Sequence, residues 1–383
     1  MPDESFAKRT TSRQSSPVTA RGIPPTPVLI CAFDTSIKHP GSMGRFLNHV
    51  ISSLEARGCR ALVLSAEELD EALHSNGLLK ILSRLRVPWL VIYWLYAFMI
   101  WRRAGCPMMV PISQEWVVPF GLSRQIPIYH DVIQYFFPRN IKSALYYRQY
   151  LRWISRKVPL IYCVTNATGR MVKRILRAKS YSLCGVPIDE EFLSRRDAPP
   201  IAEHFRAVWI GTLAAHKNSQ RLLSYAQNSA DEGNRIAMVI SKSDARALVD
   251  EIEVRGVGER FKTFSSLNER ELSNLYYSSA TVLSTSSLEG FCMPVLEAAL
   301  CGCIPVVPNR ATFRENFRRF GVLVPPHETQ YGNHLQRAEE IFTREQVAQS
   351  AREFHATVRD TWNTCMDAIA DAAKAGTGLS RLR

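Results

Sequence analysis

Two glutamates stand eight positions apart in a segment that also holds a glycine turn and a proline. Glu289 precedes Gly290, and Glu297 lies one turn inside a helix that we expect to begin near Pro294, because proline is favoured in a first helical turn. An ionised carboxylate only accepts hydrogen bonds, and its two oxygens suit a pair of hydroxyl groups. The two glutamates are therefore candidates for holding a ligand that carries several hydroxyls.

The residues just before Pro294 supply a second kind of binding group. The backbone N–H groups of Phe291, Cys292 and Met293 lie at the start of the expected helix, where N–H groups have no partner inside the helix. The positive end of the helix dipole adds attraction for negative charge. Carboxylates beside such a site predict a ligand with both phosphate and hydroxyl groups, held without a metal ion.

An α/β fold must position these groups. The apolar run 28–33, the glycine-bearing loop 34–44, the helical pattern 45–55 and the apolar run 61–64 form the opening unit of a doubly wound parallel sheet. Further apolar runs of strand length are separated mostly by helical patterns, which favours parallel sheets. These runs cover 108–111, 127–129, 160–164, 207–210, 237–240, 281–284 and 304–307.

The same strand–loop–helix opening recurs at Val208–Ala226, about halfway along the 383 residues. Two openings, in a chain too long for one ordinary core, predict two Rossmann-like domains. We expect a disordered Ser/Thr/Pro/Arg-rich tail over 1–27 and an N-terminal domain over 28–195. A C-terminal domain over 196–350 and a final helix over 351–383, which packs back toward the N-terminal domain, complete the chain.

The net charge of +13 is unevenly distributed. Residues 1–190 contain 25 Lys and Arg against 12 Asp and Glu, and the remainder is neutral. A basic first half predicts an anionic partner. Zinc-finger, RNP-type and basic-zipper patterns are absent, which argues against nucleic acid. An anionic membrane face or a phosphate-bearing ligand fits better. The nine cysteines lack paired spacing, so we expect reduced thiols and a cytosolic protein.

Residues 87–101 (VPWLVIYWLYAFMIW) contain no charge and have arginines on both sides. A spanning helix needs about 20 apolar residues, so this run is too short to predict a membrane crossing. Two interpretations stay open. The run forms a helix packed inside the first domain, or a shallow helix with Trp and Tyr at lipid headgroups. The basic first half slightly favours the second.

The segment 284–316 resembles the C-terminal signature of family 4 (group 1) retaining glycosyltransferases, whose common form is E-G-F-G-x-P-x-x-E-A. Other segments resemble that family in the same order: GSMGRF at 41–46, YHD at 129–131, CGVPIDEEF at 184–192, VWIGTLAAHKN at 208–218 and LNERELSNLYYSSATVLSTS at 267–286. The resemblance covers most of the chain. It implies the GT-B fold, in which an N-terminal acceptor domain and a C-terminal nucleotide-sugar donor domain face a central cleft.

The resemblance also implies roles for individual residues. Glu289 matches a residue that contacts donor-sugar hydroxyls near the reacting carbon, and Glu297 one that binds the ribose hydroxyls. Lys217 matches the lysine that neutralises the donor diphosphate. His130 matches a histidine that lies against the sugar and the leaving phosphate. Asp131 directly follows it, and we count both with Glu289 as candidate catalytic residues.

Further donor-binding candidates lie in the glycine loops. Gly41 and Gly44 match the loop that approaches the phosphate and sugar from the first domain. Where many members have Gly-Arg, this chain has Gly211 and Thr212, so one cationic phosphate contact is absent or replaced, with His216 and Arg221 as candidates to compensate.

Two more positions bear on the match. Cys292 stands where glycine is commonest, so the backbone there must adopt a conformation that a side chain tolerates. Glu315 matches a further family glutamate, although a carboxylate at a helix start explains it equally well.

The implied activity is retaining transfer of a hexose from GDP-mannose or a UDP-hexose to a lipid-linked or polysaccharide acceptor. We expect a cytoplasmic protein, peripheral on the inner membrane face. No Asp-x-Asp pair occurs, so no metal or other cofactor is expected. The alternative is a non-catalytic or sugar-nucleotide-binding protein, epimerase-like or phosphorylase-like, on the same scaffold. A nicotinamide oxidoreductase would need Gly-x-Gly-x-x-Gly after the first strand, which is missing.

Overall fold

The computed structural model describes residues 25–32, 42–85, 88–138, 140–193, 204–228, 235–328 and 331–376. Most of the expected tail, the loop residue Gly41 and the expected domain boundary near 195 lie outside these residues.

The first domain has parallel strands in two hydrogen-bonded groups, ordered β2-β1-β3 and β4-β5-β6. A parallel bridge between Met109 and Gln125 links the groups. The strands are β1 Thr26–Cys31, β2 Cys59–Leu64, β3 Met108–Pro111, β4 Ile128–Tyr129, β5 Ile161–Cys163 and β6 Tyr181–Leu183.

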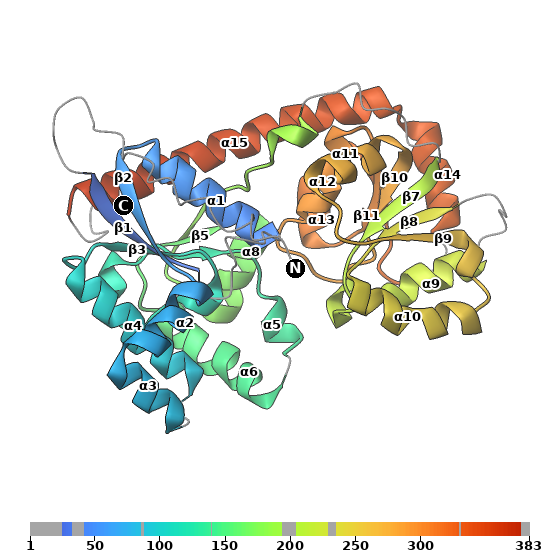
Figure 1. Cartoon of the computed structure of the whole chain (residues 1–383). Coiled ribbons are helices and arrows are strands. Elements are labelled where there is room, and N and C mark those ends of the chain that lie inside the picture. The colour runs from blue at the N-terminus through green and yellow to red at the C-terminus, as the bar shows by residue number, and fades with distance from the viewer. Residues whose placement is uncertain are drawn as a thin grey trace, which may run out of the picture.

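Helices flank these strands (Figure 1). They are α1 Ser42–Glu55, α2 Ala66–Ser75, α3 Gly77–Arg84, α4 Trp89–Arg103, α5 Ile133–Phe136, α6 Ile141–Leu145, α7 Arg152–Ser155 and α8 Asn166–Met171. Short 3₁₀ turns are η1 Gln114–Trp116, η2 Leu122–Arg124 and η5 Glu190–Phe192, and π-helical turns are η3 Tyr146–Leu151 and η4 Val172–Leu176.

The second domain has one six-stranded parallel sheet, ordered β12-β11-β10-β7-β8-β9. Its strands are β7 Phe205–Ile210, β8 Ile236–Val239, β9 Phe261–Phe264, β10 Ser279–Leu283, β11 Ile304–Pro308 and β12 Val322–Val324. Its helices are α9 Ser219–Asn228, α10 Lys242–Val254, α11 Glu269–Tyr277, α12 Met293–Leu300, α13 Ala311–Phe317 and α14 Gly332–Ile341, with 3₁₀ turns η6 Ala215–Lys217 and η7 Gly258–Arg260.

The expected fold class, two Rossmann-like domains with parallel sheets, is confirmed. The sequence did not predict β6, β9 and β12, and each of these strands lies at an edge of its sheet. An edge strand is short and only partly covered, so its sequence lacks the continuous apolar run of a central strand. In β6, for example, Ser182 is exposed and its two neighbours are half-buried.

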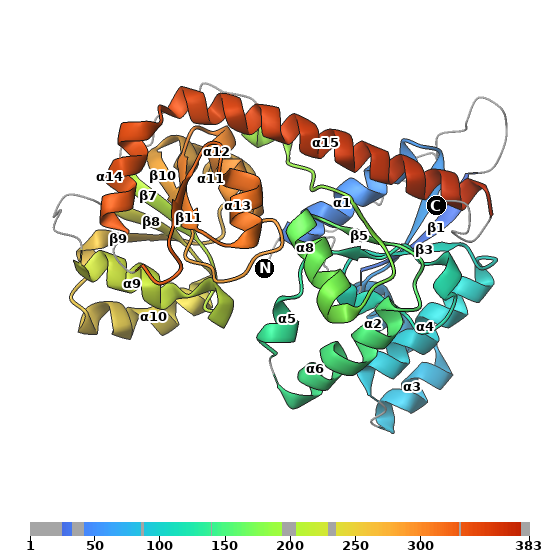
Figure 2. The same ribbon diagram turned by 180° about the vertical axis from the view of Figure 1, so that it is seen from behind.

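The last helix, α15, runs over 31 residues from Arg344 to Lys374 and lies along both domains (Figures 1 and 2). A capping box of Thr343 and Gln346 starts it, in which each side chain accepts a hydrogen bond from the backbone N–H of the other residue. The helix packs on α12 in the second domain and on α1 and β1 in the first. At the first domain, buried Trp362 donates to Ser53 Oγ at 3.1 Å.

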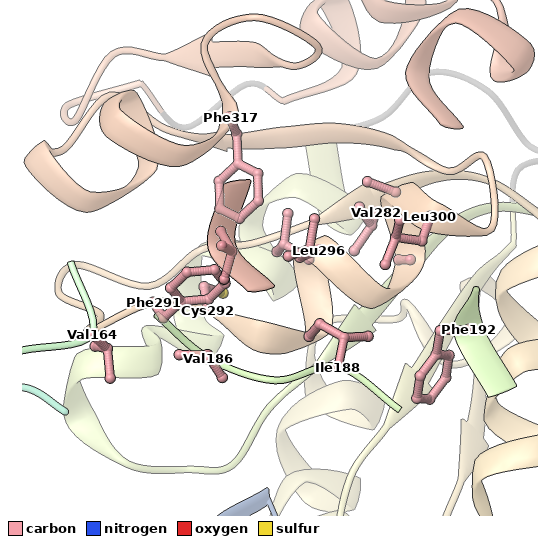
Figure 3. Close-up of a cluster of buried hydrophobic side chains, with 14 of the residues drawn as sticks. Val164, Val186, Ile188, Phe192, Val282, Phe291, Cys292, Leu296, Leu300 and Phe317 are labelled. Atoms are coloured by element: carbon pink, nitrogen blue, oxygen red, sulfur yellow. The ribbon is translucent and has the colours of Figure 1, made fainter. Parts of the chain in front are cut away.

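A buried apolar cluster is continuous between the two domains. Figure 3 shows Val164 and Val186 of the first domain beside Phe291 and Leu296 of the second. Burial of this surface stabilises the arrangement in which the domains are docked.

Helix α4 contains most of the charge-free run 87–101. Ile92, Tyr93 and Ala97 are buried against a cluster that includes Leu29 of β1 and Met109 of β3. This corresponds to the interpretation of a helix packed inside the domain. Its outer face still exposes Trp89, Leu95 and Phe98. Among the described helices, none is both long enough and apolar enough to cross a bilayer.

Candidate functional site

Helix α12 begins at Met293 with Pro294 in its first turn, as expected from the sequence. Its N-cap residue, Cys292, has φ +69° and ψ +61°, in the left-handed region. A side chain is strained in this conformation and glycine is not, which explains why glycine is common at the matching position. The Cys292 side chain is buried, and burial is the main cause that raises the pKa of its thiol.

Glu289 and Lys217 form an ion pair near the N-terminus of this helix. Lys217 Nζ donates to Glu289 Oε1 at 2.7 Å, and both side chains are largely buried. Burial alone would lower the pKa of Lys217, but the charge of Glu289, its hydrogen bond to the lysine and the neighbouring groups Cys292 and Asp131 together hold that pKa above its usual value. The lysine stays charged, with two N–H donors left for another ligand.

The loop after β10 holds the turn that carries Lys217. Thr285 Oγ1 donates to the Lys217 carbonyl at 2.7 Å, and the Ser287 N–H donates to the His216 carbonyl at 2.7 Å. The polar residues before Glu289 therefore fix the lysine and the glutamate relative to each other.

Glu297 is fully buried and bonds to the other domain. Arg45 of α1 donates from Nη2 to Glu297 Oε1 at 2.9 Å, and the Tyr276 hydroxyl donates to Oε2 at 3.4 Å. Burial raises the pKa of Glu297, and the Arg45 charge opposes that rise. A ribose could reach this carboxylate only if Arg45 moved or shared it, so ribose binding by Glu297 stays a prediction.

Arg45 has a second carboxylate partner. Its Nη1 donates to Asp189 Oδ2 at 2.8 Å, and His49 Nε2 lies 2.8 Å from Asp189 Oδ1. Burial would raise the pKa of Asp189, but its bonds and attraction to His49 and Arg45 lower it. Sequence reasoning missed this network, although GRF at 44–46 and PID at 187–189 lie inside the segments that carried the family resemblance.

Gly290 lies in close contact with the first domain. A Cβ built on it would lie 1.9 Å from the carbonyl oxygen of His130. The Gly290 carbonyl accepts from Thr165 Oγ1 at 2.9 Å, at the C-terminal end of β5. The glycine after Glu289 is thus needed because a side chain there would push the domains apart.

His130 and Asp131 follow β4 and face the Glu289–Lys217 pair. His130 Nε2 donates to the Ile112 carbonyl at 2.9 Å, which leaves Nδ1 as the acceptor nitrogen. Burial lowers the pKa of His130 to about 4, so the ring is neutral at pH 7. Burial also raises the pKa of Asp131 to about 6, and the charge of Glu289 adds to that rise.

The loop after β3 brings two further polar side chains to Asp131. Gln114 Nε2 lies 3.5 Å from Asp131 Oδ1, and the buried Gln114 Oε1 has no hydrogen-bond partner within the described part of the chain. Glu115 is held in place by the Tyr147 hydroxyl, which donates to its Oε1, and by the Tyr146 hydroxyl, which donates to its carbonyl. No sequence signal separated Gln114 or Glu115 from ordinary loop residues.

Other predicted donor-binding residues have local structural roles. Gly44 is buried in α1, and Gly211 lies against the ring of Trp209, which a Cβ would meet at 2.3 Å. Thr212 is exposed and accepts from the Ala214 N–H at 3.3 Å. Phe291 packs its side chain into the shared apolar cluster, and Met293 is half-buried (Figure 3).

Neither residue suggested as a replacement cation makes an ion pair with Glu289. Arg221 donates to the Pro326 carbonyl, and burial lowers the pKa of His216. Glu315 instead joins the domains. It accepts from the Asn166 N–H at 2.7 Å and from Arg170 Nη2 at 3.2 Å, so it caps α8 from the second domain.

Residues 194–354 match the model of the family described as Glycosyl transferases group 1. The matched range contains Lys217, Glu289 and Glu297. No curated protein matches the chain in sequence.

Solved structures resemble the chain over nearly its whole length. Sucrose-phosphate synthase from Thermosynechococcus elongatus has a TM-score of 0.65 at 14% identity, covering 90% of this chain and 96% of that one. HepE from Anabaena, in complex with UDP-glucose, has a TM-score of 0.63 at 17% identity, covering 91% and 100%. WaaG, a glycosyltransferase involved in lipopolysaccharide biosynthesis, has a TM-score of 0.64 at 13% identity, covering 90% and 99%. These likenesses show the GT-B fold.

Replacement of Arg45 by methionine should destabilise the protein in a pH-dependent way. The buried Glu297 would lose its cation, which costs about 3–5 kcal/mol of unfolding free energy. Because burial holds the folded-state pKa of Glu297 above its unfolded value, the loss should be smallest at pH 5 and grow as pH rises to 8. Urea denaturation at both pH values measures it.

Arg57→Met is the matched control. Arg57 lies just after α1 and pairs with Asp367, whose side chain is 62% exposed. A surface pair of this kind contributes about 0–1 kcal/mol. Equal losses in the two variants, or a loss for Arg45→Met that does not change with pH, would contradict the buried-pair interpretation.

Substitution Gly290→Ala should move the two domains apart, because the added Cβ would overlap with the His130 carbonyl oxygen. Small-angle scattering should show a larger radius of gyration than for the wild type. Gly258→Ala is the control, since the nearest atom to its Cβ is 3.9 Å away. An unchanged radius for Gly290→Ala would show that the contact between the domains adapts to a side chain.

Proposed function

We propose that this protein is a retaining hexosyltransferase that uses a nucleotide sugar as donor. The observation that carries the proposal is the Lys217–Glu289 pair at the N-terminus of α12, opposite His130 and Asp131. Support comes from the group 1 match over 194–354 and from HepE, whose structure contains UDP-glucose. The donor is GDP-mannose or a UDP-hexose.

The donor diphosphate lies at the start of α12 in this proposal. Lys217 and the N–H groups of 291–293 stabilise the charge that develops on the leaving phosphate. Glu289 accepts hydrogen bonds from hydroxyl groups of the transferred sugar, through the carboxylate lone pairs that do not bind Lys217. No metal ion is needed, because one ammonium and one helix terminus supply the positive charge.

The reaction proceeds on one face of the sugar. The acceptor hydroxyl oxygen bonds to the anomeric carbon as the bond from that carbon to the diphosphate breaks, and the hydroxyl proton passes to the departing phosphate oxygen. Configuration is retained. His130 is neutral, and its Nδ1 accepts a hydrogen bond from the transferred sugar. Asp131 orients the acceptor hydroxyl.

The polar groups near Asp131 favour a neutral sugar as the reacting end of the acceptor. Asp131, Glu115 and the unpartnered Gln114 oxygen all accept hydrogen bonds, and carboxylates repel a phosphate. The acceptor is therefore an existing glycan, lipid-linked or polysaccharide, that the enzyme extends. Its phosphate groups lie away from this pocket. We place the protein in the cytoplasm, peripheral on the inner membrane face, where such glycans are assembled.

Glu289→Ala should abolish transfer and leave the fold intact. The expected loss in kcat/KM is at least about 100-fold, the scale seen when one hydrogen-bonding group at a reacting centre is removed. Labelled GDP-mannose and UDP-hexoses with a glycan acceptor measure transfer. Thermal shift with nucleoside diphosphates measures donor-site binding, which at 100 times Kd adds about 2.7 kcal/mol.

Exposed Glu269→Ala is the control and should keep full activity. Near-normal turnover by Glu289→Ala would overturn the site assignment. If nucleoside diphosphates stabilise the wild type but no sugar is transferred or hydrolysed, the protein is a sugar-nucleotide binder without transferase activity.

Transfer should depend on the ionisation of Asp131. Its pKa of about 6 means that kcat/KM falls below pH 6, as the carboxylate gains a proton and loses its charge. Asp131→Asn should be slow and should show no such fall between pH 5 and 8. An identical acid limb in wild type and Asp131→Asn would assign the titration to another group.

A further inference from the structure

The segment between Asp131 and Asp189 has an extreme composition. Residues 132–188 contain eleven Lys and Arg and not one Asp or Glu. Most of the net charge of +13 therefore lies in this one stretch of the first domain. The donor site uses none of these cations, since Lys217 and Arg45 lie outside the stretch.

Four of these cations surround one hollow. Arg156, Lys157, Arg177 and Lys179 line a hollow of about 470 Å³ together with Trp153. All four are exposed, and no carboxylate of the residues that the structure describes lines the hollow. Among the described residues, none of the four side chains makes a hydrogen bond or an ion pair. Four like charges held close together without a partner destabilise one another, so the hollow suits an anionic ligand.

The hollow lies away from the donor site. Arg156 and Lys157 precede β5, and Arg177 and Lys179 precede β6, so all four sit at the N-terminal edge of parallel strands. The C-terminal edge of β5 is where Thr165 contacts Gly290. The length of the strand thus separates the hollow from the reacting groups, and its ligand is not the reacting end of a substrate.

An apolar stripe runs up to the hollow along one helix. Segments α6, η3 and α7 form a continuous helical stretch over 141–155. On its outer face Ile141 is 80% exposed, Leu145 is 56% exposed and Trp153 is 45% exposed. Their spacing of four and eight residues places them on one side of the helix. Helix α6 lies at the end of the first domain away from α15 in both views (Figures 1 and 2).

We propose that this surface, which we call the cationic face, binds anionic phospholipid headgroups. It consists of Arg156, Lys157, Arg177 and Lys179 around the hollow, with Ile141, Leu145 and Trp153 beside them. Cations contact lipid phosphates while the aliphatic side chains and the indole enter the interfacial layer. Nucleic acid fits less well, because it offers no apolar layer for Ile141 and Leu145. The proposal rests on the proposed function only in placing the acceptor at a membrane.

The cationic face differs from the helix that the sequence brought to notice. Helix α4 also exposes apolar side chains, but it buries Ile92, Tyr93 and Ala97 in the domain. The stretch 141–155 exposes Ile141 and Leu145 and ends at the hollow, which Trp153 lines. Contact through the hollow leaves the C-terminal strand edge, where Asp131 lies, free for substrates.

Co-sedimentation with vesicles tests the proposal on the full chain. Vesicles of phosphatidylcholine, with and without phosphatidylglycerol, are compared at 0.1 M and 1 M salt. The triple variant Arg156→Ser, Arg177→Ser, Lys179→Ser should bind anionic vesicles about 100-fold more weakly at 0.1 M salt, at about fivefold per cation. The double variant Ile141→Ser, Leu145→Ser should weaken the part of binding that persists at 1 M salt.

A second triple variant, Lys242→Ser, Arg246→Ser, Arg270→Ser, removes three exposed cations from the second domain and should bind like the wild type. The proposal fails if this control loses as much affinity as the first triple variant. It also fails if the wild type does not bind anionic vesicles, or binds RNA or inorganic polyphosphate but not lipid.

Nucleoside diphosphate binding separates this proposal from the donor-site assignment. The cationic-face variants should keep the thermal shift of the wild type with nucleoside diphosphates. If no nucleotide stabilises the wild type, the transferase proposal fails. The lipid-binding proposal is then still tested independently by the vesicle data.

Discussion

The guanidinium group of Arg45 is the interaction on which the docked arrangement depends. Glu297 is fully buried on α12, and a buried carboxylate without a cation is costly, so α1 of the other domain must supply one. The same side chain bonds to Asp189 in the segment that leads toward the second domain. One residue thus links α1, α12 and Asp189, and with them it helps to fix the position of the N-terminal end of α12.

Around that ion pair and the shared apolar cluster, several polar contacts between the domains use main-chain groups. The Gly290 carbonyl accepts from Thr165, and the Asn166 N–H donates to Glu315. Such contacts tolerate little displacement, because a hydrogen bond weakens steeply with distance and angle. They hold Glu289 and Lys217 of one domain opposite Asp131 of the other. The pKa of Asp131 therefore depends partly on the neighbouring domain, because the charge of Glu289 adds to the rise that burial causes.

The first domain separates its charges along the strand direction. Acceptor groups of Asp131, Glu115 and Gln114 gather at the C-terminal edge of its strands. Cations that have no partner among the described residues gather at the N-terminal edge of β5 and β6. Under the two proposals, a single basic domain would present hydrogen-bond acceptors to a neutral sugar at one edge and a positive face to an anionic membrane at the other. Net charge alone, read from the sequence, does not distinguish these two edges.

The sequence by itself determined what depends on neighbouring residues: the parallel α/β class, the start of α12 at Met293–Pro294 and the turn at Gly290. The family resemblance added Lys217 and Glu289 as candidate donor-binding residues, and the structure joined them as an ion pair. Apolar runs, a proline and a glycine act over a few positions, so their effects are visible in the chain. Tertiary structure alone decided the partner of Glu297, which lies 252 positions away, the approach of Gln114 to Asp131 and the burial of one face of α4. It also decided which of many basic residues share one hollow. These facts depend on contacts between distant segments, and no local pattern encodes which segments meet.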